Sequence, residues 1–310
     1  MFSVVIPLYN KAPHIGVTLQ SVLAQTLQPD EIIVVDDGST DGGGQVVQFL
    51  KNDRIKLLHQ VNAGVSVARN AGIAAALSNY VAFIDADDVW LPAHLETLKT
   101  LISLCPDVAL YSTMHEIHLN GARYIPKSAC PQGYMGKVDD FFGEMAKNFS
   151  LVNSSTACVK KNTFIKTGGF PVGMRRGEDL VAWIRMARAF GMAHAARVTA
   201  IYNRDAVNRS TELREQSAPG SLIYLYDLIS GKDLSVKERV SAKRLFNRIA
   251  FYTAAGMKEA GDLGGLNSIR RLVFQMGMPG LTAKLVFLAH TPPYFLTIAR
   301  RFRHSYSHAP

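Results

Sequence analysis

Short apolar runs alternate with stretches of helical periodicity along the first hundred residues. Strands are predicted at 2–8, 32–35, 55–58 and 80–84, where apolar and β-branched residues follow one another without interruption. Between these runs, apolar positions recur every three or four residues at 14–24, 46–50 and 65–77, as on one face of a helix. Strands that alternate with helices at this interval predict β-α-β units, and therefore an α/β fold with a mostly parallel sheet flanked by helices.

The pattern changes in the second half of the chain. We expect a helix at 95–104, a hairpin that starts at 108–113 and turns at Asn120-Gly121, and a last strand at 196–202. Pro7 is expected to end the pairing of the first strand, because proline has no N–H to donate. From about residue 213 onward the sequence is helical and basic, with Gly and Pro breaks. We therefore expect one domain over 1–210 and a C-terminal helical extension over 211–310.

Polar residues follow three of the predicted strands, at the point where each strand ends. Asn10 follows the first strand, Asp36 and Asp37 end the second, and an Asp-Ala-Asp-Asp run at 85–88 follows the strand at 80–84. In open α/β sheets, ligands bind beyond the carboxyl ends of the strands. These polar groups are therefore expected to share one rim.

The 85–88 run has the chemistry of a divalent cation site. Carboxylate oxygens suit Mg²⁺ or Mn²⁺, which take one or two carboxylates together with water and substrate phosphates. A second interpretation is an acidic loop in which Asp88 caps the next helix. The segment 36–41 (DDGSTD) is equally compatible with a simple turn. Two acidic strand ends in one sheet are costly unless a cation neutralises them, which favours a cation site.

Two further segments carry candidate chemistry. Glu178 and Asp179 are predicted in the first turn of a helix, where the helix dipole favours carboxylates. They can serve as a general base for an acceptor hydroxyl, or simply stabilise the helix end. Arg69 lies near the start of a helix, where its forked guanidinium can bind a diphosphate or pair with a nearby Asp.

Six segments, taken in order, resemble the family 2 glycosyltransferases, which have the Rossmann-like GT-A fold. The resemblance covers roughly residues 1 to 205. The matching segments are 4–10 (VVIPLYN), 33–41 (IVVDDGSTD), 62–70 (NAGVSVARN), 83–88 (FIDADD), 168–170 (GGF) and 178–179 (ED).

The resemblance implies a role for each of the candidate residues. The nucleotide contacts that it implies come from the ends of the first two strands, from the helix at 65–77 and from the D-x-D motif: Pro7, Tyr9, Asn10, Asp36, Asp37, Arg69, Asp85 and Ala86. Asp87 would be the direct ligand of Mn²⁺ or Mg²⁺, together with Asp85. Asp179 would be the catalytic base, with Glu178 beside it.

The reaction implied by the resemblance is the inverting transfer of one sugar from a nucleotide diphosphate sugar, in particular a UDP-sugar, to an acceptor hydroxyl. The acceptor would be a glycan or a lipid-linked glycan of the cell surface, such as lipopolysaccharide, capsule or exopolysaccharide. The Gln-x-x-Arg-Trp motif of processive members does not follow Asp179, which favours single-sugar transfer. Tyr202-Asn203-Arg204 stands where relatives often have a His near the phosphates.

Two other functions fit an α/β nucleotide site. A nucleotidyltransferase would carry a Gly- and Lys/Arg-rich phosphate loop after the first strand, and residues 9–13 (YNKAP) are not such a loop. A non-catalytic nucleotide-sugar-binding module would keep the fold without the chemistry. The presence of all the candidate acidic residues argues against this alternative.

Charge and composition add an expectation about location. The net charge is +9, and no acidic residue follows Asp262, whereas basic residues continue to the end of the chain: Arg270, Arg271, Lys284, Arg300, Arg301 and Arg303. This region can lie on an anionic membrane surface or form a solvated basic face. No nucleic-acid-binding motif is present. With three cysteines in no paired motif and no export signal, we expect a cytoplasmic protein, peripheral to the inner face of the membrane.

Overall fold

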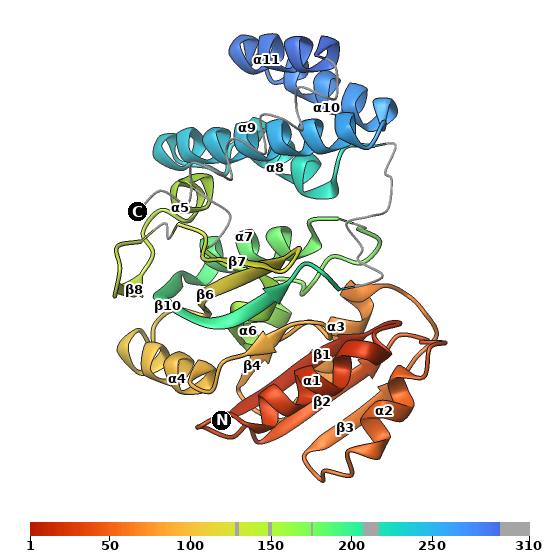
Figure 1. The fold of residues 1–310 in the computed structure, drawn as a ribbon. Helices are drawn as coiled ribbons and strands as arrows, with labels where there is room; N and C mark the ends of the chain where they lie inside the picture. Colours follow the sequence, from red (N-terminus) through yellow and green to blue (C-terminus); the bar gives the residue numbers. More distant parts are fainter. Residues whose placement is uncertain (128–129, 148–150, 175, 207–216, 292–310) are drawn as a thin grey trace. The chain divides into compact units, whose positions relative to one another are not determined.

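The computed structural model describes residues 1–127, 130–147, 151–174, 176–206 and 217–291. The chain forms two compact units, Met1–Arg209 and Ser210–Pro310 (Figure 1). Arg175, Arg300, Arg301 and Arg303 lie outside the described residues.

The first unit is built on one mixed sheet. Its strands follow the order β3-β2-β1-β4-β9-β6-β10-β5, with β7 paired to β6 and β8 paired to β10. Their bounds are β1 Phe2–Leu8, β2 Glu31–Asp36, β3 Ile55–His59, β4 Tyr80–Phe83, β5 Val89–Trp90, β6 Leu110–Leu119, β7 Ala122–Tyr124, β8 Met135–Lys137, β9 Ala157–Lys160 and β10 Met192–Asn203. The predicted α/β class is confirmed.

Parallel pairing holds for only part of the sheet. Strands β3, β2, β1 and β4 are parallel, as are β6 and β10, whereas β9, β5, β7 and β8 all pair antiparallel with their neighbours. The β6–β7 pair shows why, since two strands joined by a two-residue turn can only run antiparallel. In this turn Asn120 and Gly121 both have positive φ, 53° and 72°, which confirms the predicted hairpin.

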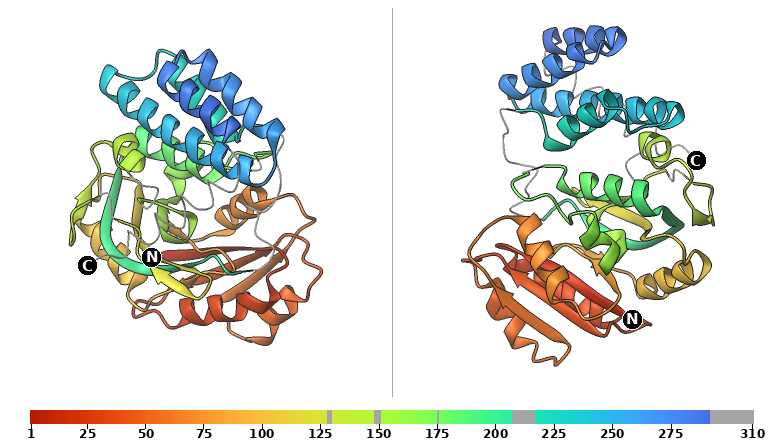
Figure 2. Two further views of the ribbon diagram at one scale, coloured as in Figure 1. Left: turned by 45° about the horizontal axis from the view of Figure 1, so that its top comes forward. Right: turned by 180° about the vertical axis from the view of Figure 1, so that it is seen from behind.

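Helices cover both faces of the parallel strands. Along β1, Val4 and Ile6 join the core packed against α1 and α2, whereas Val5 points to the opposite face, toward α3 (Figures 1 and 2). This double coverage explains why the strands are continuous apolar runs instead of alternating patterns. The helices of the unit are α1 Ala12–Leu23, α2 Gly43–Phe49, α3 Val65–Ala75, α4 His94–Leu104, α5 Phe141–Lys147, α6 Lys161–Lys166 and α7 Glu178–Phe190, with a 3₁₀ turn at Ser154–Thr156.

Two expectations from the sequence are wrong. Pro7 does not end the pairing of β1, because Pro7 and Leu8 remain in register with Val35 and Asp36 of β2. Proline is tolerated there because the pairing of β1 with β4 ends at Val5, so Pro7 has a strand neighbour on one side only. Asp88 does not cap the following helix, because α4 begins at His94 and the buried carboxylate of Asp88 is bonded elsewhere.

The second unit is helical, as expected. Its helices are α8 Gly220–Ser230, α9 Val236–Glu259, α10 Leu263–Gln275 and α11 Pro279–His290. Ser235 and Glu238 form a capping box at the start of α9, and Asp262 accepts a hydrogen bond from the backbone N–H of Gly265 at 2.8 Å. Within the part of the chain that the structure describes, no helix combines the length and apolarity needed to cross a bilayer.

Candidate active site

The loops that follow β1 and β2 are bonded to each other. The side-chain oxygen of Asn10 accepts a hydrogen bond from the backbone N–H of Thr40 at 2.8 Å, and the backbone N–H of Asn10 donates to the Ser39 hydroxyl at 3.1 Å. Asp41 accepts from the backbone N–H of Ala12 at 2.8 Å. The two strand ends predicted to share a rim therefore do so.

Asp36 and Asp37 have different partners. Asp36 accepts from the backbone N–H of Ser39 at 2.9 Å, so it folds its own loop, as the turn interpretation proposed. Asp37 is buried and accepts from the backbone N–H groups of Ala63 and Gly64 at 2.8 and 2.9 Å. The Asp37 carboxylate therefore fixes the 62–64 loop that leads into α3.

The D-x-D segment is held by buried contacts on both sides. The hydroxyl of Thr18 on α1 donates to the carbonyls of Ala86 and Asp88, at 2.9 and 2.8 Å. Asp88 accepts from the Ser155 hydroxyl and from the backbone N–H of Asn203, the latter at 2.9 Å. Burial, together with the charges of Asp85 and Asp87, raises the pKa of Asp88 well above its usual value.

Two cations pair with the D-x-D carboxylates. Lys11, from the loop after β1, places its ammonium 2.7 Å from an oxygen of Asp87. Arg69 on α3 places one guanidinium nitrogen 2.7 Å from Asp85 and another 3.1 Å from Glu178. Burial lowers the pKa of Arg69, but the charges of Asp85 and Glu178 outweigh it and raise the pKa. The pairing interpretation of Arg69 is thus confirmed, and its contact with a diphosphate stays a prediction.

Glu178 and Asp179 lie in the first turn of α7, as predicted. Burial, followed by the charge of Asp179, raises the pKa of Glu178 to about 7. Burial also raises the pKa of Asp179, although Arg69 opposes that effect. A carboxylate pair that takes up a proton near neutrality has the property of a general base.

The 168–170 motif connects α7 to α3. Asn70 on α3 donates to the carbonyl of Phe170 at 2.8 Å and accepts from its backbone N–H at 3.0 Å. The Phe170 ring lies under the Arg69 guanidinium, with 5.2 Å between the guanidinium carbon and the ring centroid. Gly169 has a φ of +63°, and a Cβ at this position would meet the side-chain oxygen of Asn70 at 2.7 Å. The motif therefore positions Arg69 between the two acidic groups.

Two residues of the site, Lys11 and Ser155, were not predicted. Lys11 directly follows Asn10, so its position in the loop after the first strand could have marked it as a site residue. Ser155 bonds both Asp88 and the backbone N–H of Asp85, the latter at 3.0 Å, and no local pattern marks it because its partners are some 70 residues away. The backbone of Asn203 reaches Asp88 from β10, so the 202–204 segment lies against the D-x-D motif.

The residues present fit a Mg²⁺ or Mn²⁺ ion. Asp85 and Asp87 supply the one or two carboxylates that these ions take beside substrate phosphates and water. Burial is the largest cause of the raised pKa of Asp88, and the negative charges of Asp85 and Asp87 add to it; a divalent cation would offset those charges. In the described residues no group of three or more His, Cys, Asp or Glu side chains is arranged to hold a metal by itself.

The sequence model of one protein family, described as glycosyl transferase family 2, matches residues 3–162. The chain belongs to this family. The matched range contains Asp37, Arg69, Asp85 and Asp87, and it ends before Glu178.

Curated relatives of the chain are described as glycosyltransferases. The chain is 46% identical over 101 residues to the uncharacterized glycosyltransferase YibD of Escherichia coli K12. The aligned region covers 32% of this chain and 29% of YibD. The chain is 32% identical over 186 residues to the uncharacterized glycosyltransferase RC0461 of Rickettsia conorii, which covers 60% of this chain and 30% of that protein. The chain thus spans less than a third of the length of these relatives.

Solved structures share the fold. The crystal structure of Staphylococcus aureus TarS 1-349 in complex with UDP-GlcNAc superposes with a TM-score of 0.72 at 19% identity, over 88% of this chain and 80% of that one. TarS 1-349 without that ligand superposes with a TM-score of 0.70 at 18% identity, over 98% of this chain and 91% of that one. At this identity the likeness supports the GT-A fold.

Proposed function

We propose that this chain transfers a single sugar from a nucleotide diphosphate sugar to an acceptor hydroxyl, with inversion at the anomeric carbon and with the help of a divalent cation. The observation that supports this most is the Asp85–Arg69–Glu178 ion-pair chain, which joins the D-x-D motif to the carboxylate pair of α7. The metal would act on the leaving diphosphate and the base on the attacking hydroxyl, on opposite sides of the anomeric carbon. The ion pairs of Arg69 keep the residues for these two functions adjacent.

The donor nucleotide is proposed to lie against the ends of β1 and β2. Asp37 is already bonded to the 62–64 loop, and Tyr9 is 48% exposed, so its ring is available to a nucleobase. Pro7 near the end of β1, Asp36 at the end of β2 and Asn10 in the loop after β1 lie at the same two strand ends. TarS, which shares the fold, has been crystallised with UDP-GlcNAc, and we propose a UDP-sugar as donor here too.

The diphosphate is proposed to lie beside the D-x-D segment. Asp85 and Asp87 would hold the Mg²⁺ or Mn²⁺ ion, with Ala86 between them, and Arg69 would approach the nucleotide from α3. The bound cation supplies neutralisation of the charge that develops on the departing diphosphate. Lys11 and Arg69 place two fixed positive charges at the same acidic cluster, 2.7 Å from Asp87 and Asp85 respectively.

Asp179 is proposed to act as the general base. It takes the proton of the acceptor hydroxyl while the acceptor oxygen bonds to the anomeric carbon. The bond between the anomeric carbon and the diphosphate oxygen breaks in the same step, so the nucleoside diphosphate leaves with the electron pair. One in-line displacement inverts the configuration and needs no covalent enzyme intermediate. Glu178 interacts with Asp179 through its charge and forms an ion pair with Arg69.

The acceptor is proposed to be a glycan or lipid-linked glycan that becomes part of lipopolysaccharide, capsule or exopolysaccharide. The absence of the processive motif after Asp179 supports transfer of one sugar per acceptor. A peripheral position on the cytoplasmic face of the membrane would give access to such acceptors.

The test is a screen of nucleotide sugars with the full chain in the presence of Mn²⁺ or a chelator, with release of nucleoside diphosphate as the readout. We expect one nucleotide sugar to be bound and slowly turned over only with the metal. Release of pyrophosphate in a parallel assay with a nucleoside triphosphate and a sugar 1-phosphate would instead indicate a nucleotidyltransferase, and binding without any turnover would indicate a binding module.

Asp87→Asn is expected to abolish metal-dependent donor binding and reduce turnover by roughly 10²-fold or more, because the direct metal ligand loses its charge. Asp107→Asn is the matched control, since Asp107 is an exposed carboxylate of the same unit that pairs with Lys137. Donor binding that is tight in Asp87→Asn, and indifferent to Mn²⁺ and chelator, would contradict the proposed metal site.

A further inference from the structure

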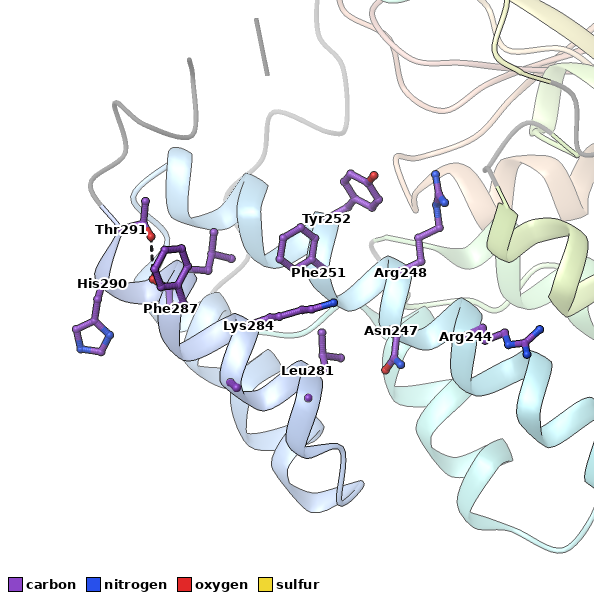
Figure 3. A pocket seen from close by; sticks show the side chains of 13 residues that line it. Arg244, Asn247, Arg248, Phe251, Tyr252, Leu281, Lys284, Phe287, His290 and Thr291 are labelled. Atoms are coloured by element: carbon purple, nitrogen blue, oxygen red, sulfur yellow. Dashed lines mark hydrogen bonds between the residues drawn. The ribbon is translucent and has the colours of Figure 1, made fainter. Parts of the chain in front are cut away.

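The second unit contains an open groove between helices α9 and α11. Its volume is about 1430 Å³, above the roughly 300–1,000 Å³ of common small-molecule sites (Figure 3). A volume of this size accommodates a long ligand. The groove lies entirely within one compact unit, so its shape follows from the packing of these helices alone.

The walls of the groove are apolar. Phe251 and Tyr252 line it from α9, and Leu281 and Phe287 line it from α11 (Figure 3). Phe287 is 76% exposed, and the neighbouring Val286 is 39% exposed. Exposed apolar side chains that lie next to each other, as these two do, are typical of a surface that contacts an apolar partner.

Positive charge lines the edge of the groove. Lys284 extends from α11 toward α9, while Arg244 and Arg248 lie one turn apart on α9 (Figure 3). The Arg248 guanidinium stacks over the Tyr252 ring at 5.3 Å. Among the described residues that line the groove there is no Asp or Glu. The edge therefore complements an anion and repels a cation.

We propose that this groove binds an anionic phospholipid of a membrane surface. One acyl chain lies along Phe251, Leu281 and Phe287, and the phosphate lies at Lys284. The single sign of the edge favours a lipid surface of uniform negative charge over a protein partner, whose surface normally carries both signs. This inference does not depend on the proposed transfer reaction.

The test is co-sedimentation of the full chain with vesicles of phosphatidylcholine, with and without phosphatidylglycerol. Binding is expected only with phosphatidylglycerol, and it is expected to weaken as salt is raised, because the phosphate contact is partly screened. Binding to neither kind of vesicle would overturn the proposal. Equal binding to both would overturn it as well.

Matched variants localise the contact. Lys284→Glu is expected to weaken binding roughly tenfold or more, because reversing one basic charge near an anionic surface removes a favourable contact and adds a repulsive one. Phe287→Ser is expected to weaken binding to a similar extent, because it removes an apolar wall of the groove. Lys243→Glu, an exposed position on α9 outside the groove, makes the same change in net charge. Phe274→Ser removes a phenylalanine that is 74% exposed on α10, also outside the groove. Both controls are expected to stay within roughly threefold of the unmodified chain.

If the groove variants and their controls lose vesicle binding to the same extent, binding depends on the overall charge and apolarity of the surface and not on the groove. That result would overturn the proposal. Unchanged thermal unfolding of each variant shows that it is folded, which is expected because all four side chains are exposed. Sedimentation velocity tests for a second copy of the chain as occupant. A change of oligomeric state in Lys284→Glu or Phe287→Ser, without loss of vesicle binding, would also overturn the lipid assignment.

Discussion

Arg69 connects the two acidic parts of the proposed site. Its side chain is 4% exposed and pairs with Asp85 and Glu178, which come from different parts of the chain. A forked guanidinium can bond two carboxylates at once, whereas a lysine ammonium is a single point charge. Removing one partner of a buried ion pair leaves an uncompensated charge, so the geometry of both acidic groups depends on Arg69.

The carboxylate pair of α7 predicts a pH dependence of turnover. A protonated carboxyl cannot accept the acceptor proton, and burial raises the pKa of Glu178 to about 7 while also raising that of Asp179. The two groups interact, so the observed pKa belongs to the pair. We expect kcat/KM to fall as the pH is lowered through about 7. The measurement is a series of initial rates at constant ionic strength, and a flat profile between roughly pH 6 and 8 would argue against this base.

His94 predicts a pH dependence of stability. Its ring is fully buried, stacks on Trp90 with 4.1 Å between ring centroids, and bonds the Thr199 hydroxyl at 2.7 Å. Burial lowers the pKa of His94 to about 3. The unfolded chain takes up this proton below about pH 6.5 and the folded chain does not, so the free energy of unfolding falls as the pH drops from about 6.5 toward 3.

His94→Phe keeps an aromatic ring against Trp90 and removes the titrating group. Between about pH 7 and 5, its unfolding free energy should fall by about 2 kcal/mol less than that of the unmodified chain. Urea unfolding at the two pH values measures the difference. Buried His115 and His194, whose pKa values burial lowers to about 4, are present in both proteins and do not contribute to the difference. The same pH dependence in both proteins would show that His94 is not held neutral.

At the scale of elements, close packing of α3 on the sheet depends on Gly72. A Cβ at this position would lie 2.4 Å from a methyl carbon of Val5 on β1. Gly72→Ala is therefore expected to lower the free energy of unfolding by about 1–3 kcal/mol, the usual cost of overpacking.

Gly16 on α1 is the matched control. A Cβ at this position would meet nothing closer than Val46 at 3.6 Å, an ordinary contact. Gly16→Ala should leave stability unchanged or raise it by up to about 1 kcal/mol, through helix propensity. Urea unfolding compares the two variants, and a Gly72→Ala protein as stable as Gly16→Ala would mean that α3 lies farther from β1 than described.

The elements that the sequence predicts well are those with a local signal. The alternation of apolar runs and helical periodicity located β1 to β4 and α1 to α3, and the Asn120-Gly121 dipeptide located the β6–β7 turn. Strands β5 and β9 have two and four residues, and their pairing depends on segments far along the chain. Periodicity therefore carried no signal for them.

The candidate site follows the same division. The strand-end position of Asp36, Asp37 and the D-x-D motif could be predicted, because parallel strands bring their carboxyl ends together. The pairing of Arg69 with Glu178 could not be predicted, since the two residues are 109 positions apart in the sequence. The burial of Asp88 likewise depends on Ser155 and Asn203, 67 and 115 residues distant.

At the scale of the whole molecule, the two proposed activities belong to separate units. The family match and the acidic site lie in Met1–Arg209, and the basic groove lies in Ser210–Pro310. Variants of the groove should therefore leave turnover of a water-soluble acceptor unchanged, and variants of the acidic site should leave vesicle binding unchanged. The roles of the units, donor binding and catalysis in one and membrane or acceptor association in the other, remain proposals that these variants separate.

The central claim is that Asp179 acts on a donor held by the loops at the carboxyl ends of β1, β2 and β4. The most direct measurement compares donor binding by calorimetry with turnover in Asp179→Asn. We predict a Kd for the nucleotide sugar with Mn²⁺ within about twofold of the unmodified chain, and a turnover reduced by roughly 10²- to 10⁴-fold, because the variant keeps the shape and loses the base. Undiminished turnover in Asp179→Asn would contradict the account.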